Sequence, residues 1–478
     1  MEYSFLCFIK ITFGGSMEKK LIFDIHDKPK FGQMLIFAFQ QVLAILAATI
    51  LVPAIVGNGM SQSAALFGAG VGTLVYQLFT KFKSPVFLGS SFAFIGSMAA
   101  AFAGAASASA GYAGLVIGAA LAGLVYVVIA LVVKFVGVAW INKLMPTVVI
   151  GPTVALIGLS LAVNAVNDLT VGKVMVEKVE QVIENNAIVE KTAFVSGCSP
   201  YVALICGLVT LFAIFAFSVY GKKMAKLIPF ILGIVVGYIA ASIFTVIGIA
   251  TDNIALQVIN FEAFKGMEIF AVPDFTFIEA FKGFGDIDGS FIATIAVAYV
   301  PVAFVVFAEH IADHKNLSSI IDRDLLEEPG LHRTLLGDGV GSIAGAFFGG
   351  CPNTTYGESV GCVAITRNAS VITISTTAIM CMVISFFGPF VTFLASIPNC
   401  VMGGVCVALY GFIAVSGLKM IQKVDLNDNR NLFVVSAILI PGIGGLSLTF
   451  GDITITTIAC ALILGIITNI ILNKGKKD

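Results

Sequence analysis

The sequence predicts an all-α polytopic membrane protein, and this expectation rests on its composition and on its long, repeated apolar runs. Of 478 residues, 58% are hydrophobic and only 12% are charged, whereas soluble domains carry roughly 25% charged residues. Apolar runs long enough to cross about 30 Å of hydrocarbon recur from residue 33 to residue 473. These features exclude a soluble enzyme and predict a chain embedded in a lipid bilayer.

Charge and cysteine content exclude several other classes of protein. The net charge of −1 gives no indication of a nucleic-acid partner. The 9 cysteines are scattered, without a CxxC pair or a nearby histidine, so they are interpreted as small apolar residues within helices. We therefore expect no metal site and no cofactor.

The N-terminal stretch raises the question of where translation begins. Residues 1–16 end in "FGGS" before "MEKK", and two Gly codons shortly before a Met can encode a ribosome-binding sequence. Met17 is therefore the working start, and a genuine extension beginning at Met1 is the alternative. The stretch lacks the small-residue cleavage site of a signal peptide.

Fourteen membrane segments account for the apolar runs. We place them at 33–57, 63–80, 85–98, 111–135, 138–162, 200–219, 225–249, 289–312, 333–350, 354–367, 369–396, 397–417, 430–448 and 453–473.

The distribution of lysine and arginine supports this number of segments. Cytoplasmic loops collect both residue types, and with the N-terminus inside, most of them fall on the cytoplasmic side. The outside receives only Lys173, Lys178, Lys191, Lys265 and Lys282. The asymmetry holds only when the short segments 85–98 and 354–367 are both counted, and it places both termini in the cytoplasm.

The fourteen segments divide into two blocks of seven. The predicted organisation is a cytoplasmic N-terminus over 1–32, a first repeat over 33–250, an extracellular loop over 251–288, a second repeat over 289–473 and a cytoplasmic tail over 474–478. Because seven is odd, the second block starts from the opposite side of the membrane, as in an inverted repeat. Segments 3 and 10 are short, contain Gly and Ser, and occupy matching positions. Such pairs indicate a transporter's binding site.

Two carboxylates at membrane depth are the strongest candidates for function. Glu358 lies in "NTTYGESVGCVAITR", and Glu309 ends the run "VAYVPVAFVVFAEH". A buried membrane carboxylate is costly and typically marks a substrate or proton path. Asp313 follows Glu309 by four residues and shares its helix face, although Asp313 could simply end the helix in solvent. Two carboxylates on one face disfavour joint ionisation.

Other titratable residues carry weaker signals. Asp338 follows "LHRTLL" and is interpreted as lying near the cytoplasmic interface. His310 points about 100° away from Glu309 around the helix, and His314 lies about 140° away. Neither histidine has the spacing or carboxylate support of a metal ligand.

Four stretches, "AEHIADH", "FLGSSFAF", "GCPNTTYGESVGCVAITR" and "PGLHRTLLGDG", resemble the nucleobase–ascorbate transporter family over residues 30–470. Within that family they look most like the bacterial proton-coupled uracil permeases. The family signature is an acidic residue or Gln, then Asn, any residue, Gly, four residues, Thr and a basic residue or Gly. The chain matches it at Glu358, Val360, Gly361, Thr366 and Arg367.

Two positions depart from the family pattern. Ser359 stands where the signature has Asn, and an early Gln-His pair of the family reads Gln40-Gln41 here. These departures bear on substrate preference rather than on family membership.

The resemblance implies two inverted sevens divided into a core and a gate domain, with a short strand and a half-helix in segments 3 and 10. The substrate is implied to bind between these breaks, held by the side chains of Glu309 and Glu358. The remaining substrate contacts, through backbone hydrogen bonds or ring packing, are assigned by position to Phe92, Gly357, Tyr356 and Ala48.

Proton-coupled uracil import across the cytoplasmic (inner) membrane is the function that the resemblance implies. Uracil alternates N–H donors and C=O acceptors along its edge, and a protonated carboxyl group offers the complementary pair in one plane. A proton on Glu309 or Glu358 would cancel a buried charge and complete this pairing, so proton and base would bind together. Asp313 joins these two as a coupling residue. A homodimer is left open.

Two alternatives remain. The first is a symporter for xanthine or another purine, which more often carries Gln at the Glu358 position. The second is an anion exchanger of a related seven-plus-seven fold, which two central carboxylates disfavour.

Overall fold

Long apolar helices make up most of the computed structural model, which describes residues 21–137, 145–184, 187–222, 224–450 and 453–473. Within these residues, seven helices are long and apolar enough to cross a membrane. They occupy Phe31–Val56, Ala108–Val136, Thr147–Asp168, Pro200–Tyr220, Pro229–Ala250, Gly289–Ile321 and Asn399–Ile421. The protein is therefore a multi-pass membrane protein.

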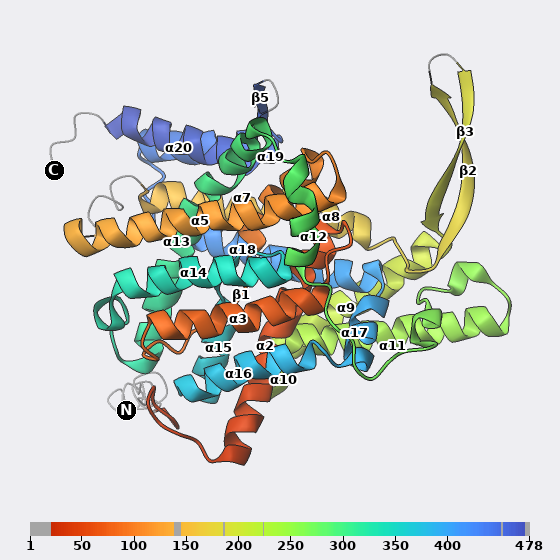
Figure 1. Ribbon diagram of the computed structural model, residues 1–478, viewed down its shortest axis with the longest axis horizontal. Coiled ribbons are helices and arrows are strands. Elements are labelled where there is room, and N and C mark those ends of the chain that lie inside the picture. Colours follow the sequence, from red (N-terminus) through yellow and green to blue (C-terminus); the bar gives the residue numbers. More distant parts are fainter. Residues whose placement is uncertain (1–20, 138–144, 185–186, 223, 451–452, 474–478) are drawn as a thin grey trace, which may run out of the picture.

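The helices are labelled as in Figure 1. In chain order they are α2 (Phe31–Val56), α3 (Gln62–Phe79), α4 (Ile95–Ala103), α5 (Ala108–Val136), α7 (Thr147–Ser160), α8 (Ala162–Asp168), α9 (Pro200–Tyr220), α10 (Met224–Leu227), α11 (Pro229–Ala250), α12 (Thr276–Gly283), α13 (Gly289–Ile321), α14 (Leu331–Gly349), α15 (Gly357–Thr366), α16 (Val371–Ile384), α17 (Gly388–Ser396), α18 (Asn399–Ile421), α19 (Asn429–Ile443) and α20 (Thr457–Asn473). Short 3₁₀ helices are η1 (Phe92–Phe94), η2 (Ile254–Leu256), η3 (Phe261–Phe264) and η4 (Phe284–Asp286).

Six short strands form three two-stranded antiparallel sheets. The strands are β1 (Leu88–Ser90), β2 (Met175–Glu184), β3 (Ala187–Ser196), β4 (Asn353–Thr355), β5 (Leu448–Phe450) and β6 (Ile453–Ile455). β1 pairs with β4, so segments 3 and 10 meet although they are far apart in the chain. Each of these two strands is followed by a short helix, as predicted. β2 and β3 form a hairpin that extends away from the helices (Figure 1).

The chain is mostly helical, as predicted, but it has two strand pairs beyond the short strands expected in segments 3 and 10. The β2–β3 hairpin lies between two predicted segments. α19 ends at Ile443 rather than at 448, and the β5–β6 hairpin takes Leu448 and the first three residues of the predicted segment 453–473. The predicted segment 369–396 is two helices, α16 and α17, because Pro389 at the start of α17 has no N–H with which to continue α16. α13 continues to Ile321 rather than ending at 312.

Some predictions concern residues outside the described ranges. These are the proposed start at Met17, the untranslated status of residues 1–16, the first part of segment 138–162 and the tail at 474–478.

Glycines bring α3 and α14 into close contact, and this contact supports β4. The two helices run side by side in Figure 1. A Cβ built on Gly72 would lie 2.7 Å from the carbonyl oxygen of Gly341, and the reverse distance is also 2.7 Å. Only glycine permits this approach. Asn353, the first residue of β4, donates to the carbonyl of Gly68 on α3 at 3.1 Å, so the packed helix pair fixes the strand.

Candidate functional site

A cavity of about 380 Å³ lies where the β1–β4 pair meets α13 and α18. Most of the residues predicted for the site line it. They are Phe92, Glu309, Asp313, Tyr356, Gly357 and Glu358. Ala48 is different: it is 2% exposed in the core and is not among the lining residues.

The β4 strand aims the start of α15 at the cavity. α15 begins at Gly357, and Glu358 occupies its first turn. The first N–H groups of a helix have no partner within that helix and form a site for electronegative atoms. Tyr356, just before the helix, donates its hydroxyl to the carbonyl of Ser90 on β1 at 2.8 Å. The strand pair thereby holds both the aromatic ring and the helix N-terminus in place.

Gly89 is required for this arrangement. A Cβ at Gly89 would lie 2.3 Å from the ring of Tyr356, which is closer than any side chain tolerates. The absence of a side chain on β1 therefore lets the tyrosine ring lie against the strand.

Two carboxylates of α13 reach the same cavity. Glu309 and Asp313 are four residues apart on a continuous helix and so share a face. Asp313 accepts a hydrogen bond from the Thr355 hydroxyl at 2.6 Å, which ties α13 to β4. Asp313 is therefore not a solvated helix end. No described residue forms a hydrogen bond or ion pair with the side chain of Glu309 or of Glu358, so both can bind a ligand in the cavity.

Behind the cavity lies a buried polar network that the sequence analysis missed. The His310 ring contacts Asp338 (Nδ1 to Oδ2, 2.7 Å) and Thr334 (Nε2 to Oγ1, 2.9 Å). His314 stacks on His310, with ring centroids 4.0 Å apart, and its Nε2 lies 2.8 Å from the hydroxyl of Tyr76. The network therefore links α13 to α3 and α14.

Asp338, which the sequence analysis placed near the cytoplasmic interface, is buried inside the protein and is not solvated. Asp338 is 1% exposed, because the small residues around it let α14 pack tightly between α3 and α5. The sequence signal was the aspartate within "GDGVGSIAG", since a glycine-lined helix is a buried helix in a membrane protein.

The two departures from the family signature contact one another. The buried Gln41 side chain on α2 donates to the Ser359 hydroxyl at 2.5 Å. Ser359 directly follows Glu358 in the first turn of α15. This bond therefore connects α2 to the turn that carries the carboxylate.

Removal of either partner of this bond is expected to destabilise the protein. We expect Gln41→Ala and Ser359→Ala each to cost about 1–3 kcal/mol, because each leaves a buried polar group unpaired. The double variant should lose less stability than the sum of the two single losses, by about 0.5–3 kcal/mol, because the second substitution removes a group that the first has already left unpaired. Thermal unfolding in detergent measures this coupling, with the exposed Gln422→Ala as the control. Strictly additive losses would show that the bond is absent.

Comparison with known proteins gives both a family and a fold. The Permease family model (Xan_ur_permease) matches residues 32–450. The "Uracil permease" of Bacillus subtilis (strain 168) is 36% identical over 96% of this chain and 97% of its own length. The "Uracil permease" of Bacillus caldolyticus is 38% identical over 95% of both chains.

Two solved structures have a similar fold. The transmembrane domain of a cyanobacterium bicarbonate transporter has a TM-score of 0.61 at 15% identity, and the match covers 94% of this chain and all of that domain. A murine Solute Carrier 26 family member A9 anion transporter in the inward-facing state also has a TM-score of 0.61, at 12% identity, covering 98% of this chain and 74% of that one. At these identities the likeness concerns the fold alone.

Proposed function

This chain belongs to the Permease family (Xan_ur_permease), as its sequence motifs predicted, and from that premise we propose that it imports uracil together with protons across the cytoplasmic membrane. A permease moves its substrate and is not an enzyme. One observation carries the proposal. Glu309 and Glu358 come from different helices, face one cavity and have no partner in the described protein. The uracil permeases among its relatives support this substrate.

The base is proposed to bind edge-on between the two carboxyl groups. Glu309 and Glu358 read the alternating donors and acceptors of the uracil edge. The backbone N–H of Gly357 at the start of α15 binds a ring carbonyl, while Phe92 and Tyr356 pack against the ring. We leave Ala48 out of these contacts because it does not line the cavity.

Coupling follows from the cost of burying charge. An unpaired carboxylate in a largely apolar cavity is strongly disfavoured, and a proton on Glu309 or Glu358 removes that charge and supplies the O–H that uracil needs. Asp313 extends the pair to a third carboxyl group, one that the Thr355 hydroxyl already binds. Proton and base therefore favour each other's binding, as symport requires.

The proposed arrangement in the membrane is fourteen spans, with both termini in the cytoplasm. Two inverted repeats, 33–250 and 289–473, flank an outer loop at 251–288. The antiparallel pairing of β1 with β4 supports this symmetry. A core and a gate domain are supported by the packing of α3, α5, α13 and α14 in one group and of α7, α9, α11 and α18 in another.

Two competing functions are less well supported. The two solved structures of similar fold are a bicarbonate transporter and an anion transporter, but three carboxyl groups around one cavity of this chain would repel an anion. A purine symporter of the same family would more often carry Gln in place of Glu358.

Uptake in cells that lack their own uracil carrier tests the proposal. We expect cells given this chain to accumulate radiolabelled uracil, and a protonophore to abolish the accumulation. Unlabelled uracil should compete more strongly than xanthine or adenine. Uptake that follows a sodium gradient and ignores the protonophore would contradict proton coupling.

Asp313 and His314 are expected to differ in function although they are neighbours. Asp313 lines the cavity, whereas His314 is fully buried behind it. We therefore expect Asp313→Asn to impair proton-driven uptake more than His314→Gln does. Initial uptake rates of both variants across external pH, at matched expression, measure the difference. Wild-type activity of Asp313→Asn at every pH would exclude the carboxyl group from coupling.

A further inference from the structure

A second, larger cavity lies beyond the site described above. Its volume is about 730 Å³, and it is lined where α2 ends, α3 begins and α8 and α18 meet. It shares no lining residue with the central cavity. In the topology proposed above, the helix ends around it lie on the outer side of the membrane.

One face of α18 runs through both cavities. Residues spaced three or four apart lie on one face of a helix. On α18 this face passes from the central cavity, at Leu409, Ile413, Ser416 and Met420, to the outer one, at Asn399, Met402 and Cys406. Ten residues separate Leu409 from Asn399, which is about 15 Å along a helix. The two cavities therefore lie in line along the same helix.

The α7–α8 segment repeats this arrangement. Val154 and Ile157 line the central cavity, and Asn164, Asn167 and Asp168 line the outer one. Both α18 and the α7–α8 segment therefore present mainly apolar side chains to the central cavity and asparagine side chains to the outer one.

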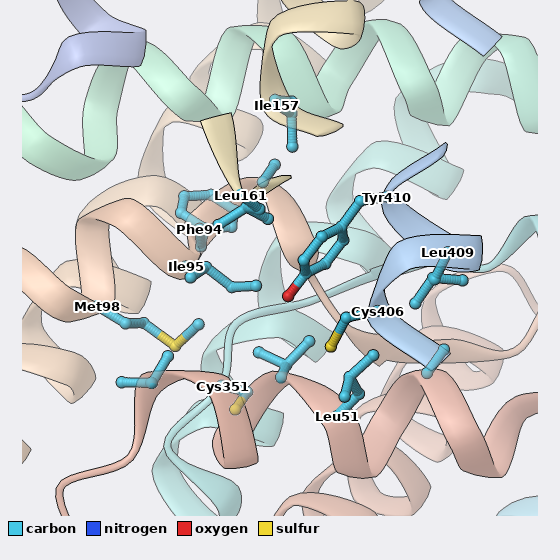
Figure 2. Close-up of a cluster of buried hydrophobic side chains, with 14 of the residues drawn as sticks. Leu51, Phe94, Ile95, Met98, Ile157, Leu161, Cys351, Cys406, Leu409 and Tyr410 are labelled. Carbon is cyan, nitrogen blue, oxygen red and sulfur yellow. The ribbon is translucent and has the colours of Figure 1, made fainter. Parts of the chain in front are cut away.

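An apolar cluster separates the cavities. Figure 2 shows Leu51, Ile157, Leu161, Cys406 and Tyr410 packed together, with the Tyr410 hydroxyl directed into the cluster. Leu51 and Cys406 line the outer cavity, whereas Ile157 lines the central one. Members of this one cluster therefore line both cavities, and the cluster lies between them.

The outer cavity has the chemistry to bind a neutral, planar, hydrogen-bonding ring. The side chains of Asn164, Asn167 and Asn399 form no hydrogen bond with any described residue, and an amide presents a donor and an acceptor in one plane. Asp168, Asp274 and Lys173 also line it, and because its carboxylates outnumber its lysine, the cavity has little attraction for a free anion. Amide pairs of this kind match the edge of a nucleobase.

We propose that this outer cavity is a second nucleobase subsite on the transport path, in which Asn164 and Asn399 hold the base before the apolar cluster opens. This inference rests on the proposed function, because it assumes nucleobase import from that side. The subsite is wide and polar, so it binds weakly and exchanges its base rapidly with the outer solution, while the central cavity selects and couples.

The first test is the kinetics of uptake by the Asn164→Ala/Asn399→Ala double variant. We expect its KM for uracil to rise about fivefold or more, because two amide contacts are lost. The rate at saturating uracil should stay close to that of wild type, and so should equilibrium binding of uracil to the purified protein, which reports on the central cavity. Asn429→Ala is the matched control, since Asn429 is an exposed residue at the start of α19 that lines neither cavity.

The second test is protection from a membrane-impermeant maleimide on whole cells. Asn167→Cys, in a Cys406→Ser background, lines the outer cavity and leaves Asn164 and Asn399 in place. It should be labelled from outside, and uracil should slow the labelling in a concentration-dependent way. Ser416→Cys, which lines the central cavity, should react much more slowly. An unchanged KM together with labelling that uracil does not slow would overturn the subsite. Wild-type protein that takes up no nucleobase would instead overturn the proposed function itself.

Discussion

Glu358→Gln is expected to abolish concentrative uracil uptake while part of the uracil binding survives. An amide keeps a planar donor and acceptor but cannot exchange a proton. The variant should therefore equilibrate uracil across the membrane without accumulating it. Glu358 sits in the first turn of α15 and has no partner in the described protein, so the change breaks no internal bond and should leave stability close to that of wild type.

Glu309→Gln is the companion variant, and we expect it to weaken the binding of uracil. Glu309 is the side-chain anchor that α13 supplies, and losing a charge-assisted bond costs about 1.5–3 kcal/mol, or roughly ten- to 150-fold in affinity. Equilibrium binding of radiolabelled uracil to purified protein and the accumulation ratio in cells separate the two variants. Glu327→Gln, at an exposed residue of the short π-helix Leu326–Gly330, is the matched control. If Glu358→Gln accumulates uracil as wild type does, that residue takes no part in coupling.

The candidate site could be predicted from the sequence because carboxylates are costly within apolar membrane segments and are therefore rare there. A carboxylate among apolar residues stands out without any structure, and Glu309, Asp313 and Glu358 do line one cavity. The short Gly- and Ser-containing segments also stand out, and they form the β1–β4 pair. The long apolar runs likewise predict the membrane-spanning helices.

What the sequence could not provide is the contact between elements that are distant in the chain. The sequence placed Asp338 near the cytoplasmic interface but gave no sign that its side chain is buried against other helices. The Gln41–Ser359 bond joins residues 318 positions apart, and no local pattern predicts such a pairing. The hairpin β2–β3 lies in a polar connection between two apolar segments, so hydrophobic periodicity gave little signal.

Asp338→Ala is expected to destabilise the protein strongly and to reduce uptake with it. Asp338 and the His310 ring are almost completely buried, and their contact is 2.7 Å. Removing one partner of a buried pair costs about 3–5 kcal/mol when the other is left charged, and less when it is neutral. The loss should spread to the central cavity, because His310 directly follows Glu309 on α13 and sets the rotation of that helix against α14.

Thermal unfolding in detergent, followed by uracil binding on the folded fraction, measures both effects. We expect Asp338→Asn, which keeps an acceptor for the ring, to recover part of the stability lost in Asp338→Ala. His310→Gln should lower the unfolding temperature, whereas His332→Gln, the same change at a residue with no hydrogen-bond partner among those described, should not. Since Asp338 does not line the cavity, a folded variant should lose affinity less than Glu309→Gln does. Full stability and full uptake for Asp338→Ala would show that the buried pair does not hold α13 in place.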